Sequence, residues 1–261
     1  MFKNIKNIKN IITFCWLGIV LILSACSSKT GPAEAYRGET PKQIFQAGEL
    51  DVQKGDYSEA VKRFEALDVQ YPLERETELA DVQLVYAYYR KEEYPLAIAA
   101  ADRFTRLHPM SRYTDYVYFV QGLSEYLQNQ GVLDRLFSVD LAKRDLLPMK
   151  KAFFAFSAVV DQFPNSPYAP VAYQYMTYLR NTMARHQLQL AQFYFDRKAY
   201  VAAINRANGL IEHYQGAPAV PLALVLMVKS YRGLGLKQEE KDTVALLQHN
   251  YPSSSYMREV R

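Results

Sequence analysis

A helical frame that returns along the chain is the feature that most constrains its fold. In the first copy, the turn at 55–59 is followed by apolar residues at Ala60, Phe64 and Leu67. The copy ends at the pair Tyr71-Pro72, and we call the pair that ends each copy its closure. This spacing is typical of one face of an α-helix, and Pro stops a helix because it has no amide hydrogen to donate. Similar closures follow at 109, 164, 215 and 252, so that successive closures lie 37, 55, 51 and 37 residues apart. Such units cannot bury their apolar faces alone, so the sequence predicts that they stack.

The pattern within each copy predicts the kind of stack. An Ala and a large apolar residue lie four apart, and Pro follows the Ala after twelve residues, which is the tetratricopeptide pattern with its period of about 34. Small residues let neighbouring helices approach, and we expect Gly48 and Gly122 at this small position in the first helix of their repeats. The chain is therefore predicted to be all-α, a tetratricopeptide α-solenoid of about five repeats. Repeats one to three are expected over 41–165, and repeats four and five over 166–261.

The two longer spacings predict where the repeats are irregular. The spacing of 55 leaves a surplus of 18 residues, which we expect to form a loop over 129–147. The spacing of 51 leaves 14 extra residues, and the run 171–208 contains neither Pro nor Gly. Fourteen residues are close to four helical turns, so we expect a long helix from about Tyr168 to Phe195, followed by a turn at 196–199. The fourth closure has Gln215 in place of Pro, and we expect that helix to run on.

The N-terminus has the pattern of a bacterial lipoprotein signal. Three Lys residues precede an uncharged, mostly apolar stretch over 11–23, which is too short to span a bilayer. Leu23-Ser24-Ala25 then places small residues directly before Cys26, whereas bulky Phe14 precedes Cys15. We predict that residues 1–25 are removed and that Cys26 carries the lipid. The alternative is a chance tract of small residues in an ordinary secretory signal.

The residues after Cys26 predict where the lipidated chain sits. Lipoproteins with Asp after the acylated Cys tend to stay at the inner membrane, and here Ser27 follows, which favours the outer membrane. The stretch over 26–40 is rich in small and polar residues and is expected to be a flexible tether. Two or three acyl chains hold a protein on a membrane far better than one.

Charge and composition exclude several functions. Removal of Lys3, Lys6 and Lys9 with the signal leaves 28 basic residues against 27 acidic ones, so no basic field of the kind that binds nucleic acid remains. The four histidines are spread along the chain, without a His or Cys partner at metal-ligand spacing. Gly233-Leu234-Gly235 is interpreted as an inter-helix turn rather than a phosphate loop. We therefore expect no enzyme, no metal site and no cofactor other than the covalent lipid on Cys26.

Aromatic residues indicate a binding surface. The chain has 21 Tyr and 13 Phe, and the first helix of each tetratricopeptide repeat lines the concave surface of the solenoid. Aromatic side chains bury much area at little rotamer cost, and the hydroxyl of Tyr can pair with peptide backbone, so this surface suits an extended peptide. The alternative for each residue is that it fills a gap between repeats. Counting from the small position places these residues on the concave surface: Phe45, Tyr86, Tyr89, Arg90, Tyr116, Phe119 and Tyr126.

Several longer stretches make the resemblance specific. The stretches at 63–72, 84–89, 95–97, 102–104 and Asp115-Tyr116-Val117, and later those at 139–140, 144–145, 163–166 and 202–206, resemble the BamD family of β-barrel assembly lipoproteins over nearly all of the chain after the signal. The resemblance implies a scaffold at the periplasmic face of the outer membrane. Its N-terminal repeats would capture unfolded outer-membrane proteins, with Asp115 added to the candidate binding residues. Its C-terminal repeats would dock on the periplasmic domains of a BamA-type barrel protein, alongside other lipoproteins of the machine.

Arg197 is the candidate docking residue, because it lies in a turn where its guanidinium is expected to be exposed and able to pair with a carboxylate of the partner. The alternative is a solvated turn charge. Two other functions stay open for the chain as a whole. One is a pilotin-like chaperone, which predicts a more regular 34-residue array without the loop at 129–147. The other is a cell-wall factor that binds peptidoglycan.

Overall fold

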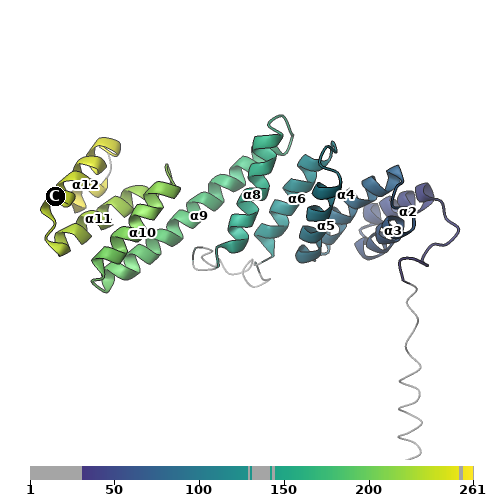
Figure 1. The fold of residues 1–261 in the computed structure, drawn as a ribbon, viewed down its shortest axis with the longest axis horizontal. Helices are drawn as coiled ribbons and strands as arrows, with labels where there is room; N and C mark the ends of the chain where they lie inside the picture. Colours follow the sequence, from purple (N-terminus) through teal and green to yellow (C-terminus); the bar gives the residue numbers. More distant parts are fainter. Residues whose placement is uncertain (1–30, 129, 131–141, 143–144, 253–254, 261) are drawn as a thin grey trace, which may run out of the picture.

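The computed structural model describes residues 31–128, 130, 142, 145–252 and 255–260. These residues form ten α-helices and one short 3-10 helix, arranged side by side in an elongated row (Figure 1). The described part of the chain contains no β-strand. The helices in chain order are α2 (Pro41–Lys54), α3 (Tyr57–Gln70), α4 (Arg75–Arg90), α5 (Tyr94–Leu107), α6 (Thr114–Leu127), α8 (Leu147–Gln162), α9 (Ala169–Asp196), α10 (Tyr200–His213), α11 (Val220–Leu234), α12 (Lys237–Asn250) and η2 (Ser255–Glu259).

The ten helices pair into five repeats in which each helix packs on the next, as the sequence predicts. Local signals begin and end them. Thr40 begins α2 with a capping box, since its hydroxyl accepts from the Gln43 amide while the Gln43 side chain accepts from the Thr40 amide. Gly55 ends α2 with a φ of 79°, a conformation that costs Gly little. The predicted closures at Tyr71, His108, Phe163, Tyr214 and Tyr251 each stand directly after the last residue of a helix.

Glycines set the closest approaches between paired helices. A Cβ atom at Gly48 would lie 2.5 Å from the ring of Phe64, and one at Gly122 would lie 2.7 Å from the ring of Phe156. Both glycines therefore occupy the small position, as predicted. A Cβ atom at Gly233 would likewise lie 2.7 Å from the ring of Tyr200. Gly233 lies inside α11, so its assignment to a turn is wrong, and only Gly235 ends the helix, with a φ of 73°.

The long helix is confirmed as α9, which runs over 28 residues. Its first half packs against α8 through Ala172 and Leu179, and its second half joins the core of the last two repeats through Ala184 and Ala191. One continuous helix therefore connects two separate core clusters. The prediction that α10 runs past its closure is wrong, because the helix ends at His213 and Gly216 then takes a φ of 75°.

The two ends of the row are covered by short segments. At the front end, the Gln70 side chain donates to the carbonyl oxygens of Pro32 (2.7 Å) and Ala35 (2.5 Å), which holds the segment before α2 against the end of α3. At the rear end, Glu259 of η2 pairs with Lys229 of α11 at 2.7 Å, and Val260 is buried. The predicted signal, Cys26 and most of the loop at 129–147 lie outside the described residues. Within that loop, the carbonyl of buried Ala142 contacts His186 Nδ1 at 2.5 Å.

Candidate functional site

Phe45, the residue of α2 that was expected on the binding surface, lies in the core instead. Phe45 is only 9% exposed, and its ring centroid lies 6.1 Å from that of Phe64 in the core of repeat one. The assignment of Phe45 to an exposed ligand-facing position is therefore wrong. Gly48 has no side chain, so Phe64 moves close to α2 and Phe45 fills the remaining space beside it.

Tyr86 and Arg90 form a surface cluster with Tyr57, which sequence reasoning missed. The rings of Tyr57 and Tyr86 meet edge to face with centroids 6.1 Å apart. The guanidinium of exposed Arg90 lies 4.8 Å from the Tyr57 centroid, and its Nη1 donates to the Tyr86 hydroxyl at 2.5 Å. The cluster presents a cation stacked on two rings that remain partly accessible, an arrangement that can receive an aromatic or acidic group of a ligand.

Tyr89 and Tyr116 extend this cluster to the next repeat, but they are more enclosed. The Tyr89 ring lies 6.1 Å from that of Tyr94, and the Tyr116 ring lies 5.4 Å from that of Tyr168. Burial raises the pKa of Tyr116 above its ordinary value, and the nearby hydroxyls of Tyr168, Tyr86 and Tyr89 add to the effect. These tyrosines therefore gather their hydroxyls in one place, where they remain neutral and able to donate.

Phe119 serves mainly as packing. Its ring lies 5.9 Å from the buried ring of Phe156 and stacks at 5.2 Å on Tyr168. Asp115 is half-buried in the first turn of α6, and its Oδ1 accepts from the amide of Tyr116 at 2.7 Å. The carboxylate keeps further acceptor capacity for a ligand donor.

Tyr126 opens onto the most accessible part of this surface. Its ring meets those of Tyr175 and Tyr178 edge to face, at 5.5 and 6.1 Å. With Val171 and Gln174, these residues line a hollow of about 380 Å³ between α6 and the first half of α9. Tyr178 is 44% exposed and Val171 is 41% exposed, so the hollow is apolar at its mouth. A large side chain of a peptide would fit it.

We call the whole set the aromatic row. The sequence missed four of its members, Tyr57, Tyr168, Tyr175 and Tyr178, and the three-residue spacing of the last two on a long helix was the available signal. Phe45 is excluded, and Arg90 is stacked on two rings of the row, Tyr57 and Tyr86. The aromatic row consists of Tyr57, Tyr86, Tyr89, Tyr116, Phe119, Tyr126, Tyr168, Tyr175 and Tyr178.

Arg197 is exposed, as predicted, and its side chain is held in place. The guanidinium carbon lies 3.5 Å from the centroid of the Phe193 ring, and Nη1 donates to the Phe193 carbonyl at 3.3 Å. Phe193 is itself 47% exposed on α9. The stacked guanidinium therefore presents its remaining donors to solvent, in a geometry suited to a carboxylate.

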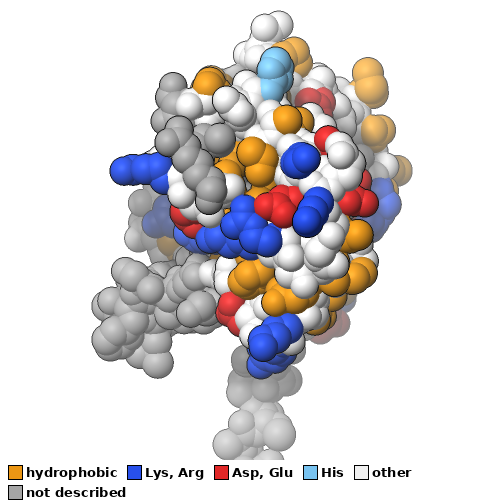
Figure 2. Space-filling view, turned by 90° about the vertical axis from the view of Figure 1, so that its left-hand side faces the viewer, with side chains coloured by type: hydrophobic (Ala, Val, Ile, Leu, Met, Phe, Trp, Pro, Cys, Tyr) orange, Lys and Arg blue, Asp and Glu red, His pale blue; other side chains and the backbone are white. Residues whose placement is uncertain are grey.

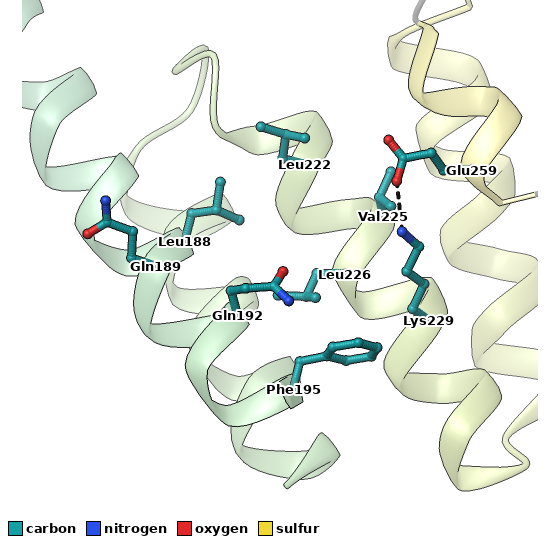
Figure 3. Close-up of a pocket in the computed structure, with 9 residues that line it drawn as sticks. All are labelled: Leu188, Gln189, Gln192, Phe195, Leu222, Val225, Leu226, Lys229 and Glu259. Carbon is teal, nitrogen blue, oxygen red and sulfur yellow. Dashed lines mark hydrogen bonds and ion pairs between the residues drawn. The ribbon is translucent and has the colours of Figure 1, made fainter. Parts of the chain in front are cut away.

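The rear end of the molecule carries a second, apolar hollow (Figure 3). It has a volume of about 290 Å³ and lies between α9 and α11. Leu188, Phe195 and Leu226 point into it, and the ion pair of Lys229 with Glu259 crosses its edge. Seen from this end, Lys and Arg side chains lie among Asp and Glu side chains with hydrophobic side chains between them (Figure 2).

The described residues contain no cluster of three or more His, Cys, Asp or Glu side chains that could hold a metal ion. In the same part of the chain, no helix has both the length and the apolar character needed to cross a membrane. His108 is half-buried against Phe104, with ring centroids 5.1 Å apart. His249 is exposed at the end of α12.

Two solved structures have a distant likeness to this chain. A putative kinesin light chain from Podosopora anserina is 12% identical with a TM-score of 0.35, covering 83% of this chain and 99% of that one, and PilF from Pseudomonas aeruginosa is 17% identical with a TM-score of 0.30, covering 84% and 95%. Sequence relatives are much closer. The outer membrane protein assembly factor BamD of Vibrio cholerae is 34% identical over 229 residues, covering 88% of this chain and 94% of the relative.

The BamD of Neisseria meningitidis serogroup A is 32% identical over 240 residues, covering 91% of this chain and 90% of the relative. The sequence model of the YfiO family, described as outer membrane lipoprotein, matches residues 37–247. That match begins just before α2 and ends within α12, so it spans all five repeats. The chain therefore belongs to the YfiO family of outer-membrane lipoproteins, together with the BamD assembly factors.

Proposed function

We propose that this protein is a non-enzymatic scaffold for the assembly of outer-membrane proteins. Membership of the YfiO family and the name of the BamD relatives support this role and an association with the outer membrane. The finer proposal has three parts. Cys26 carries a lipid that holds the chain at the periplasmic face, the aromatic row binds C-terminal segments of unfolded barrel proteins, and the rear repeats dock on the periplasmic domains of a BamA-type protein, beside other lipoproteins of the machine.

The observation that carries the binding part is the hollow at Tyr126. Barrel strands alternate apolar and polar side chains, so an extended strand offers an apolar side chain on one face at every second position. Val171, Tyr175 and Tyr178 give the hollow apolar walls, while the phenol hydroxyls around Tyr116 can pair with backbone groups of the same peptide. Pockets for alternate side chains and polar contacts to the backbone are the two needs of extended-peptide recognition.

The test is site-specific photo-crosslinking in cells. A photo-reactive residue at Tyr86 or at Tyr178 should capture newly made barrel proteins, because both positions are partly exposed on the aromatic row. The matched control is Lys62, an exposed residue of α3 whose ammonium pairs with Glu59 at 2.8 Å. Equal capture at Lys62 and at the row positions would show that the row is core packing and that recognition lies elsewhere.

A further inference from the structure

Two exposed apolar residues stand at equivalent places in the turns that join one repeat to the next. Leu73, in the turn between α3 and α4, is 98% exposed, and Met110, in the turn between α5 and α6, is 94% exposed. Each directly follows the closure of its repeat. The same position is occupied by polar Asn165 after repeat three and by Gly216 after repeat four. Only the front half of the molecule therefore presents side chains of this kind at these turns.

The two turns form one continuous edge. The hydroxyl of Ser111, next to Met110, donates to the carboxylate of Glu78 in the first turn of α4 at 2.7 Å, which ties the second turn to the helix that begins beside Leu73. Leu107 at the end of α5 is 60% exposed on this edge. We call Leu73, Leu107 and Met110 the apolar edge. Arg75, Arg106 and Arg112 flank these residues along the chain and are exposed as well, with exposed Glu74 between Leu73 and Arg75.

The start of the described chain lies at this same edge. Pro32 and Ala35 accept from the side chain of Gln70, three residues before Leu73. The hydroxyl of Tyr71 donates to the carbonyl of Glu39 at 3.0 Å. Gly31 lies five positions after Cys26 in the sequence, and a fully extended chain over five steps reaches at most about 18 Å. A lipid on Cys26 is therefore confined to the neighbourhood of the apolar edge.

We propose that the apolar edge rests on the lipid surface, as a second membrane contact beside the acyl anchor. Exposed Leu and Met side chains flanked by Arg are the combination that sits at a bilayer interface, with the apolar groups among the acyl chains and the guanidinium groups at the phosphates. The short reach from Cys26 keeps these side chains close to the bilayer, so the contact costs little further entropy. The two contacts together orient the row of repeats relative to the membrane. The inference rests on the proposed acylation of Cys26.

The test measures how close each turn comes to lipid. Single Cys variants of the acylated protein, Leu73→Cys, Met110→Cys and the matched control Asn165→Cys, receive an environment-sensitive fluorophore. They are then bound to phosphatidylethanolamine–phosphatidylglycerol vesicles that contain a spin-labelled lipid. We expect blue-shifted emission and severalfold stronger quenching at positions 73 and 110 than at 165. Equal quenching at all three positions, or none at 73 and 110, would overturn the proposal.

A second arm separates this contact from the anchor. The chain from residue 26 is held through an N-terminal histidine tag on nickel-chelating lipid, which restores the tether without the acyl group. Palmitate labelling of the parent and of its Cys26→Ser variant tests the anchor by itself. If positions 73 and 110 are quenched on nickel lipid but the chain takes up no palmitate, the membrane contact of the apolar edge is supported and the acylation of Cys26 is contradicted. If Cys26 takes up palmitate but neither arm shows quenching at these positions, the acylation is supported and the membrane contact of the apolar edge is contradicted.

Discussion

Repeats one to three and the last two repeats bury different kinds of side chain. The front section has Phe64, Phe104 and Phe156 fully buried at its centre, with tyrosines around them. The core cluster of the rear section consists of Ala, Ile, Leu, Val and Met, with Phe and Tyr residues at its margin. Aromatic rings give the front section hydroxyls and flat faces near its surface, which suit a variable extended ligand. The close aliphatic packing of the rear section suits a fixed shape for docking.

The polar contacts of the two sections also differ, in whether they join one repeat to another. In the front section, Arg103 of α5 reaches Asp68 of α3 at 2.6 Å and Asp81 of α4 at 2.5 Å, so one side chain joins three helices of two repeats. In the rear section, the ion pair of Arg232 in α11 with Glu240 in α12, at 2.8 Å, stays within one repeat, and the hydroxyl of buried Ser230 donates to the carbonyl of Leu226 within its own helix. A polar network between repeats fixes their relative placement, but it makes the front section sensitive to pH.

The largest predicted effect is a change of folding stability with pH, caused by the titration of Asp81. Asp81 is 4% exposed, and burial raises its pKa to about 6, with Asp68 adding to the effect and Arg103 and His108 opposing it. A carboxyl with a raised pKa in the folded state binds its proton more tightly there than in the unfolded chain. Folding therefore loses stability at this site as pH rises from about 3 to about 7, by about 3 kcal/mol.

Asp81→Asn removes the titration while keeping the shape of the side chain. The free energy of unfolding of the parent, minus that of the variant, should fall by about 3 kcal/mol between about pH 3 and pH 7. Urea unfolding at several pH values in this range measures both curves. Parallel curves would show that the network between the front repeats does not depend on the protonation of Asp81.

The second prediction compares the packing around one glycine of each section, Gly122 and Gly209. A Cβ at Gly122 would lie within 2.9 Å of three atoms of the Phe156 ring, which is fully buried and stacks at 4.9 Å on Tyr175. The ring cannot move aside, so Gly122→Ala should destabilise the protein by about 1 to 3 kcal/mol. Gly209 in α10 has no atom within 4 Å of its added Cβ among the described residues. Gly209→Ala should stabilise by about 0.5 to 1 kcal/mol, because Ala is the better helix former.

Thermal and urea unfolding of these two variants measure the contrast. If both substitutions destabilise equally, the close contact of Gly122 with Phe156 is not what makes the front section intolerant of a side chain. If Gly122→Ala is neutral, repeat three can relax around the added methyl group, and the aromatic core is looser than its ring stacking indicates.

The elements that sequence reasoning located are those with a local chemical cause. Closures were visible because Pro or an aromatic residue recurs there, and Gly48 and Gly122 were found because they replace Ala in a spaced pattern. Gly233 was missed because Gly-Leu-Gly resembles a turn, and only the position of Tyr200 reveals it as a packing site. Local pattern therefore predicts the repeats, but not which small residue faces a large one.

The candidate site was predictable to a smaller degree. Counting along helices places Tyr86 and Tyr126 on the concave surface, but it cannot tell that Phe45 fills space beside Phe64. Tyr175 and Tyr178 were missed because they lie on α9, whose 28 residues do not fit the repeat template. Packing between distant rings decides which aromatic side chains stay accessible, and spacing alone does not contain that information.

The last prediction tests whether the two sections bind different partners. Arg197 is stacked on Phe193 at 3.5 Å, so its guanidinium is already ordered before a partner arrives and loses little entropy when it pairs with a carboxylate. Arg197→Glu should weaken binding to the isolated periplasmic domains of a BamA-type protein by at least about tenfold, which is about 1.4 kcal/mol. Helicity and melting should stay unchanged because the side chain is exposed.

Lys198→Glu is the matched control, since it makes the same change of charge one residue further along the same exposed turn. A general loss of positive charge would weaken binding to a similar degree in both variants and would be relieved by salt. A specific pair at Arg197 predicts a loss in that variant alone. Photo-crosslinking of nascent barrel proteins from Tyr86 should then be retained in Arg197→Glu, because the aromatic row lies on the front repeats and the first half of α9. Simultaneous loss of docking and of crosslinking would instead mean that α9 couples the two sections, and that the front and rear repeats act as one binding unit.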